Sequence, residues 1–466
     1  MRQFRSIYTA IFLTLSFLFF GFAQSSSPFF KNGDVICFLG DSITHGGQYH
    51  EFLQLFYATR YPELTLSFHN CGISGDNAAG MIERFEEDVM KHKPTHVFLM
   101  TGMNDVNRTL YFEGTASDKI LKQRANALAN YKRNTTLLAE KIIENDVTPI
   151  FLTPSIYDQY SKIERENNLG CNDALIECSN HLKKLGQKYN AIVIDLNTPM
   201  RKLMERELKR DSLFTIIGND RVHPGATGHF IMFHEIISRL EKPGIISKIA
   251  IDLSQNEPID SSLYATTEEL HISENTLSFN ITEKCLPFPV SDQLLSALSL
   301  TLFEQKYNWH MLQVEGLEKA NYDLIIEDVY INSFSHHELK KGVNIANYGN
   351  TPQNIQARAL QKIIADYRKT SFQLRIIPFI KYKYLQNYNG QDDLAEKRMY
   401  LNNQLKVIEQ KPYHGYIKSS MEAFFETLPK IDSLEKRKRQ LSEQIHSFYS
   451  PKKQQWKLIK RASAKI

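Results

Sequence analysis

The sequence is poor in cysteine and tryptophan, with five and two in 466 residues. Cys37 and Cys71 lie in apolar, strand-like runs, where cysteine behaves as a small buried hydrophobe. Cys171 and Cys178 are seven residues apart in a helical pattern. Their Cα atoms would be about 10 Å apart, beyond disulfide reach unless the helix begins after Cys171. Disulfides are therefore not required by this sequence, and whether Cys171 pairs with Cys178 stays open.

Motifs that hold metals or phosphates are also missing. No His-Glu-x-x-His occurs, and the His336-His337 pair lacks a zinc-type ligand set. The Gly46-Gly47 pair is not followed by Lys-Ser or Lys-Thr, so a phosphate-binding loop is not supported. We therefore expect neither a metal nor another cofactor.

Only one long apolar run occurs, and it lies at the N-terminus. Arg2 and Arg5 precede the run Ile7–Phe22, which ends in small residues of the kind that signal peptidase reads. The run is shorter than the roughly 20 residues that a membrane span needs. We expect a signal peptide cleaved between Ala23 and Gln24, and an exported protein, periplasmic or extracellular, with no stable membrane insertion afterwards.

The first half of the chain alternates short apolar runs with amphipathic segments. The runs are rich in Val, Ile, Leu and Phe, as buried parallel strands are. The segments between them carry apolar residues at helical spacing. This alternation predicts a three-layer α/β domain with a parallel five-stranded sheet. The expected strands are Val35–Leu39, Leu64–Phe68, His96–Thr101, Thr148–Thr153 and Ala191–Leu196, and the expected helices Tyr49–Tyr61, Ala78–Lys91, Gln123–Asn145, Asp173–Tyr189 and Thr227–Leu240.

The second half has a different pattern. Alternating residues and Gly-containing turns between residues 250 and 345 predict a small antiparallel β region. Helical patterns follow after Pro352. The alternating runs are Leu298–Leu302, His310–Val314 and Tyr322–Ile326, and the helical runs are Ile355–Tyr367, Leu394–Ile408 and Ser419–Phe448. The expected division is a signal peptide at 1–23, a catalytic domain at 24–245, a β-rich region at 246–350 and a helical region at 351–466.

Basic residues are concentrated at the C-terminal end. Residues 430–466 contain eleven Lys and Arg against three Asp and Glu, while the whole chain carries a net charge of +4. This end could bind an anionic glycan or a membrane surface, but we interpret it as the solvated face of a terminal helix with a frayed tail. Because stacking aromatic residues are not interleaved with these charges, we expect no nucleic-acid partner.

Polar residues follow the expected strands at the edge where reactive groups gather in parallel sheets. Ser42 stands in Gly-Asp-Ser-Ile-Thr after the first strand, and His223 in Asp-Arg-Val-His-Pro near the end of the first half. A serine hydroxyl needs a base, and His223 is the candidate. Asp220, three residues earlier, can accept the Nδ1 proton of that imidazole. The segments thus predict a nucleophile, a base and a group that orients the base.

Two further segments can stabilise an oxyanion. Gly75 follows the second strand and can present a backbone N–H, and Asn104 follows the third strand and presents a side-chain amide. With the N–H of Ser42 they give three donors. Gly72 is the alternative glycine, and Asp41 is interpreted as a structural acceptor in the Ser42 turn.

These four segments, in this order, resemble the SGNH (GDSL-type) hydrolase family over residues 34–240. The name of that family denotes a serine, a glycine, an asparagine and a histidine, which here are Ser42, Gly75, Asn104 and His223. The first segment has Ile43 where the family's motif has leucine. The resemblance implies a flavodoxin-like fold and a serine hydrolase that cleaves carboxylic esters. The second half is similar to the accessory region of a two-domain, esterase-like subgroup.

The substrate is the least determined part of the hypothesis. We expect a small ester or acylated glycan, with acetyl groups removed from a carbohydrate and His45, Tyr49 and Tyr157 near the substrate. One alternative is a lysophospholipase or thioesterase with a longer acyl pocket. Another is a noncatalytic glycan-binding or envelope scaffold protein. The oligomeric state and the role of residues 250–466 stay open.

Overall fold

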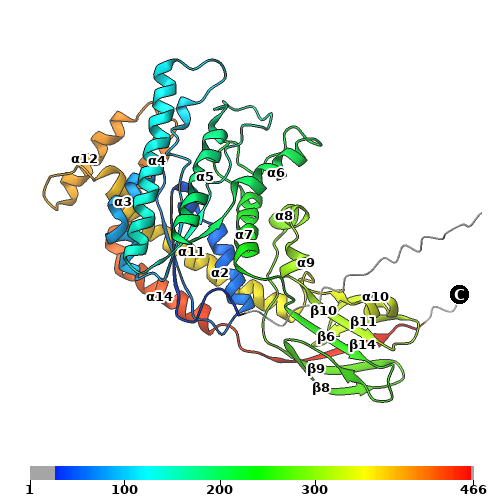
Figure 1. Ribbon diagram of the computed structural model, residues 1–466. Coiled ribbons are helices and arrows are strands. Elements are labelled where there is room, and N and C mark those ends of the chain that lie inside the picture. Colours follow the sequence, from blue (N-terminus) through cyan, green and yellow to red (C-terminus); the bar gives the residue numbers. More distant parts are fainter. Residues whose placement is uncertain (1–26, 463–466) are drawn as a thin grey trace, which may run out of the picture.

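The computed structural model describes residues 27–462, so the expected signal peptide lies outside the described residues. The described chain forms an α/β unit, a β region, and long C-terminal helices that extend from the β region along the α/β unit (Figure 1). Among residues 27–462, no helix combines the length and the apolar character needed to cross a membrane.

Five parallel strands form the central sheet of the α/β unit, as predicted. Their order is β2-β1-β3-β4-β5, so the first strand in the chain lies inside the sheet. The first strand is almost fully buried because it has neighbours on both sides and helices above and below. The strands are β1 Val35–Gly40, β2 Ser67–Gly72, β3 His96–Met100, β4 Thr148–Leu152 and β5 Ile192–Ile194.

Helices cover both faces of this sheet. One row consists of α3 Ala78–Arg84, α4 Asp118–Glu144 and α5 Cys171–Tyr189, which pack against one another. Another pair consists of α2 Tyr49–Arg60 and α7 Ala226–Leu240. The three-layer α/β prediction is therefore confirmed. A short helix α6, Asn197–Glu207, was not predicted.

Several boundaries in this unit differ from the sequence prediction, and two of the differences are informative. We expected the second strand at Leu64–Phe68, but β2 begins at Ser67 and continues through the polar pair His69 and Asn70. Because β2 is the edge strand of the sheet, it tolerates polar residues that a central strand would exclude. The helix expected to reach Lys91 ends as α-helix at Arg84 and continues as a π-helical turn, Phe85–Val89.

The β region contains two sheets that enclose a second apolar core. One has the order β13-β10-β6-β7 and the other β12-β11-β14-β9-β8. Residues from both sheets, such as Leu312 and Phe279, belong to one buried cluster. The strands are β6 Ser247–Asp252, β7 Ile259–Asp260, β8 Ala265–Ile272, β9 Thr276–Glu283, β10 His310–Glu315, β11 Asn321–Ile326, β12 Val329–Ser335, β13 Val343–Asn344 and β14 Lys453–Lys460.

Two expectations for this region are wrong. The region is not wholly antiparallel, because β6 and β10 pair in parallel. Leu298–Leu302 is not a strand: the segment covers the end of the short helix α8, Leu295–Leu300, and the bend before the short helix α9, Phe303–Tyr307. An alternation over five residues is too short to distinguish a strand from a helical turn.

Residues 453–460 form a strand, β14, where the sequence predicted a frayed tail after a terminal helix. β14 pairs antiparallel with β9 on one side and β11 on the other, so it lies inside its sheet. Trp456 and Leu458 are fully buried. Apolar residues two positions apart are typical of a strand, but the surrounding lysines made the segment look like a solvated tail.

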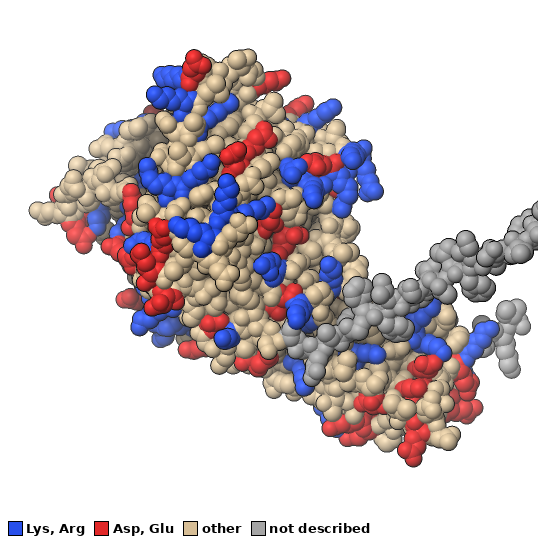
Figure 2. Space-filling model, in the orientation of Figure 1, with Lys and Arg blue, Asp and Glu red and all other residues tan. Residues whose placement is uncertain are grey.

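The basic residues at this end are largely paired. Lys453 contacts Glu268 and Glu269, and Arg461 contacts Asp323. Figure 2 shows the acidic side chains gathered on the β region beside them. The Lys and Arg residues of 453–461 are therefore paired with acidic residues of the same chain.

The C-terminal helices connect the two units. α11 is much longer than predicted, Pro352–Tyr384, and contacts α2, β2 and the helix that follows β1. α13, His414–Thr427, and α14, Ile431–Ser447, pack against α11. The short α10, His336–Lys341, precedes them in the chain, and α12, Leu394–Val407, lies between α11 and α13.

Candidate active site

Ser42 is the first residue of α1, Ser42–Gly46, which follows β1 directly. The carboxylate of Asp41 accepts the Ile43 N–H at 2.9 Å and caps this helix. A Cβ on Gly40 would lie 2.1 Å from the Thr44 hydroxyl oxygen, so only glycine lets the helix start this close to the strand. Asp41 is buried, and burial raises its pKa to about 6. The structural role expected for Asp41 fits this geometry.

The three expected catalytic side chains form one hydrogen-bonded chain. His223 Nδ1 donates to Asp220 Oδ2 at 2.5 Å, and Ser42 Oγ donates to His223 Nε2 at 2.7 Å. Asp220 also accepts the N–H groups of Val222 and His223, at 3.0 and 2.9 Å. This places an unprotonated imidazole nitrogen at the serine hydroxyl, which is the arrangement that a serine nucleophile needs.

The Asp220 carboxylate stays ionised in this setting. Partial burial alone would raise its pKa. Hydrogen bonds from the His223 side chain and from the His223 and Val222 N–H groups favour the ionised form and lower the pKa of Asp220 well below its ordinary value.

Arg221 holds the turn between Asp220 and His223, and sequence reasoning missed it. Its side chain is buried, and its backbone has a left-handed φ of 64°. The guanidinium donates to the carbonyl oxygens of Asp158 and Ser161 at 2.9 and 3.1 Å, and to that of Ile163 at 2.8 Å. Because the turn is anchored through Arg221, Asp220 and His223 are held within hydrogen-bonding distance of each other, and His223 reaches Ser42.

The segments that carry the expected oxyanion donors follow neighbouring strands, and these strands end side by side. Gly40 pairs with Gly72 on β2 and with Met100 on β3, so the three segments that follow begin side by side. The N–H groups of Ser42 and Gly75 have no acceptor among residues 27–462. Asn104 Nδ2 donates one hydrogen to the Asp76 carbonyl oxygen at 2.8 Å and has a second one to offer.

The structure favours Gly75 over Gly72 as the donor. The Gly72 N–H donates to Asn70 Oδ1 at 2.8 Å, and a Cβ on Gly72 would lie 2.3 Å from the His45 nitrogen. Gly72 is therefore a packing position with an occupied N–H. Gly75 is exposed, with a left-handed φ of 73° and an open space around it.

The residues expected near the substrate are buried instead. His45 is 2% exposed, and Tyr49 and Tyr157 are each 1% exposed. The Tyr49 hydroxyl hydrogen-bonds to Thr44, and the Tyr157 hydroxyl to Asn168. Closeness to Ser42 in sequence was misleading for His45 and Tyr49, since the turn of the chain after Ser42 directs them into the core.

Buried ion pairs join the Gly75 side of the site to α11. Arg375 donates two hydrogen bonds to Asp88, at 2.6 and 2.5 Å, and a third to the Gly72 carbonyl oxygen at 2.9 Å. Arg84 joins Asp88 to Asp76. Burial alone would raise the pKa of Asp88, but Arg375 and Arg84 lower it well below its ordinary value. Nothing in the local sequence of α11 indicates this contact.

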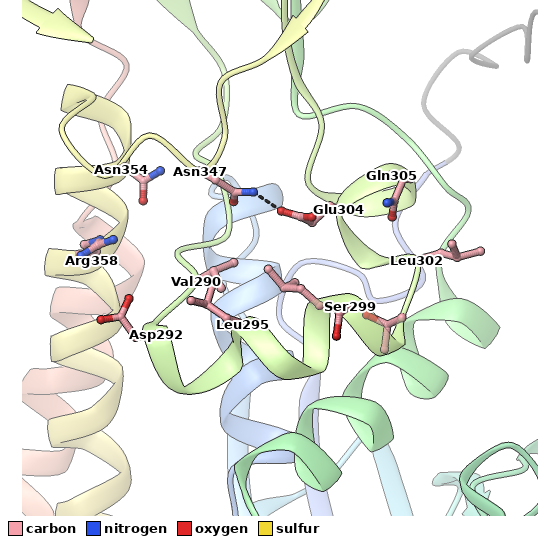
Figure 3. Close-up of a pocket in the computed structure, with 12 residues that line it drawn as sticks. Val290, Asp292, Leu295, Ser299, Leu302, Glu304, Gln305, Asn347, Asn354 and Arg358 are labelled. Atoms are coloured by element: carbon pink, nitrogen blue, oxygen red, sulfur yellow. Dashed lines mark hydrogen bonds between the residues drawn. The ribbon is translucent and has the colours of Figure 1, made fainter. Parts of the chain in front are cut away.

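Two hollows lie away from these residues. One, of about 520 Å³, is lined by α8, α9 and the start of α11 (Figure 3). The other, of about 960 Å³, lies between α6, α7 and α8. Neither contains Ser42, His223, Gly75 or Asn104. Within residues 27–462, no group of three or more His, Cys, Asp and Glu side chains is arranged to hold a metal ion.

Comparisons with known proteins agree with this geometry. Residues 38–231 match the model of the GDSL-like Lipase/Acylhydrolase family. An acetylxylan esterase from Geobacillus stearothermophilus is 24% identical over an alignment of 229 residues, which covers 43% of this chain and 91% of that protein.

The fold of both halves also occurs in a solved structure. It is that of BT4096, a gut microbial diltiazem-metabolizing enzyme, which matches 94% of this chain and 100% of its own with a TM-score of 0.82 and 23% identity. At that identity the likeness shows the fold. The family model and the esterase relative support a GDSL-like lipase/acylhydrolase domain at residues 38–231, and they support a carboxylic-ester hydrolase.

Proposed function

We propose that the protein is an exported serine esterase that removes acetyl groups from a carbohydrate through an acyl-Ser42 intermediate. The observation that carries the mechanism is the chain of hydrogen bonds from Asp220 through His223 to Ser42. The expectation of export depends on the N-terminal apolar run with its preceding arginines.

The first half of the reaction forms the acyl-enzyme. His223 Nε2 takes the proton of Ser42 Oγ as that oxygen attacks the ester carbonyl carbon. Asp220 stabilises the imidazolium that results. The carbonyl oxygen becomes an oxyanion, and the N–H groups of Ser42 and Gly75 and the free amide hydrogen of Asn104 are the donors for it.

The second half releases the acid. The tetrahedral intermediate collapses, the ester C–O bond breaks, and His223 gives its proton to the departing alcohol oxygen. Water then attacks the acyl carbon while His223 Nε2 accepts a proton from it. The second tetrahedral intermediate expels Ser42 Oγ, which regains a proton from His223, and the carboxylic acid leaves.

Two observations support a carbohydrate ester as substrate. The relative that shares residues across the catalytic half is an acetylxylan esterase. In addition, the ring of Phe372 is 43% exposed and stacks on His45, three residues from Ser42. An exposed aromatic ring that packs on the helix carrying the nucleophile offers a flat apolar surface for a ligand ring.

The test is acetate release from 4-nitrophenyl acetate and from acetylated xylo-oligosaccharides. We expect Ser42→Ala to lower kcat by at least about 10³-fold on both. Ser433→Ala, at an exposed position on α14, should match the wild type. Full activity of Ser42→Ala would refute the mechanism. Faster cleavage of octanoyl than acetyl esters would refute the acetyl preference, because each buried methylene adds about 0.8 kcal/mol in a deep apolar pocket.

A further inference from the structure

Two side chains from the C-terminal helices hold the loop that carries Gly75. Lys383, near the end of α11, donates from Nζ to the Gly75 carbonyl oxygen at 3.0 Å. Tyr416, on α13, donates from its hydroxyl to Ser74 Oγ at 3.1 Å. These residues lie more than 300 positions away from the loop in the sequence.

The same loop is attached to the nucleophile helix on its inner side. The Ser74 N–H donates to His45 Nδ1 at 3.2 Å, and Ser74 Oγ lies 2.9 Å from that nitrogen. His45 Nδ1 is therefore unprotonated. Burial and the neighbouring Arg375 and Arg84 lower the pKa of His45 to about 3, so the ring is neutral. Its place on α1, three residues after Ser42, links Ser74 to the nucleophile.

These contacts surround the peptide bond that contributes the Gly75 N–H. Ser74 is held through its N–H and its hydroxyl, and Gly75 through its carbonyl oxygen. The Asp76 N–H donates to the Ile73 carbonyl oxygen at 3.1 Å. A Cβ on Gly75 would have no neighbour within 4 Å. The direction of its N–H is thus set by hydrogen bonds on either side, two of them from the C-terminal helices.

We propose that Lys383 and Tyr416 are positioning residues for ester hydrolysis, which fix the Gly75 N–H in the oxyanion site and so make catalysis depend on the C-terminal helices. This inference rests on the proposed function of Gly75. An oxyanion donor contributes only when it is aimed before the transition state forms. Removing its support lowers kcat, whereas binding of the ground-state ester changes little.

The experiment compares matched variants on 4-nitrophenyl acetate. Lys383→Met loses a charged donor and should lower kcat about tenfold to a hundredfold, and Tyr416→Phe about threefold to tenfold, with KM within about twofold of the wild type. Lys383→Arg should regain most of the lost kcat. The controls are Lys381→Met and Tyr413→Phe, exposed positions on the same helix and at the start of α13, which should leave kcat unchanged.

The outcomes separate this inference from the proposed function. If Ser42→Ala inactivates the enzyme while Lys383→Met and Tyr416→Phe keep wild-type kcat, the positioning role is refuted and the mechanism stands. A rise in KM at unchanged kcat would also refute positioning, because it indicates substrate contact. Melting temperatures are measured alongside: loss of kcat in proportion to loss of folded protein, without rescue by Lys383→Arg, would assign these residues a structural role only. Retained activity in Ser42→Ala refutes the proposed function itself.

Discussion

The two sides of Ser42 are held in place by different parts of the molecule. On one side, His223 and Asp220 are 47% and 44% exposed, and the hydrogen bonds between them span three residues. On the other side, the Gly75 loop rests on Arg375, which is 6% exposed and comes from α11, about 300 residues further along the chain.

This difference distinguishes the residues that transfer protons from the residues that hold the oxyanion site in place. The base and its orienting carboxylate form a local turn that a short sequence can encode, and their surroundings contribute little burial. The oxyanion side depends on buried ion pairs, one of which includes Arg375 from the distant helix α11. Substitutions on the two sides should therefore affect different quantities, activity on the first and stability together with activity on the second.

The largest effect is expected for Asp220→Asn. An amide cannot hold the His223 tautomer or stabilise the imidazolium, so kcat for 4-nitrophenyl acetate should fall by about 10³–10⁴-fold. The melting temperature should stay within about 2 °C of the wild type, because an exposed ion pair contributes little to stability. A variant with near wild-type kcat would show that Asp220 does not orient the base.

Arg375→Met should chiefly affect stability. It leaves Asp88 with one fewer buried partner, and breaking such a pair costs about 3–5 kcal/mol. Arg368→Met is the comparison on the same helix: its side chain is 37% exposed, so the loss should be clearly smaller than for Arg375→Met. Urea unfolding measures both. Equal losses would contradict the contrast between buried and exposed support.

The smallest effect concerns Asp41, the residue before Ser42, which caps the helix that Ser42 begins. Its pKa in the folded protein is about 6, above the usual 3.8. The folded state therefore binds more protons than the unfolded state between about pH 4 and 6, and the contribution of Asp41 to stability falls across that range by about 3 kcal/mol. Asp41→Asn removes this loss, so the variant should gain stability relative to the wild type as the pH rises from 4 to 7. A stability difference independent of pH would contradict the assigned burial of this carboxyl.

The sequence predicted what depends on neighbours in the chain. Ser42, Asn104 and His223 stand in short motifs, and two of them directly follow apolar strands, so strand order alone brought them to one edge. Arg375 and Lys383 could not be found this way. Each is one charged residue in a helix rich in such residues, and only tertiary packing decides which of them become buried or reach the site.

Errors at other elements have the same origin. β14 looked like part of a basic tail because its lysines are visible in the sequence and its acidic partners are not. Tyr49 and His45 looked accessible because they follow Ser42, whereas the turn of the chain directs them into the core. In both cases the sequence does not show which side of the strand or helix packs against another part of the chain.

Labelling with a fluorophosphonate probe tests the central claim most directly, since the probe reacts with a serine activated by a base and placed at an oxyanion site. We predict that mass spectrometry of the digested wild type finds the probe on Ser42. Labelling should be much slower in Asp220→Asn, moderately slower in Lys383→Met and absent at this position in Ser42→Ala. An enzyme that cleaves 4-nitrophenyl acetate while its Ser42 stays unlabelled, or that carries the probe on another serine, would contradict this account.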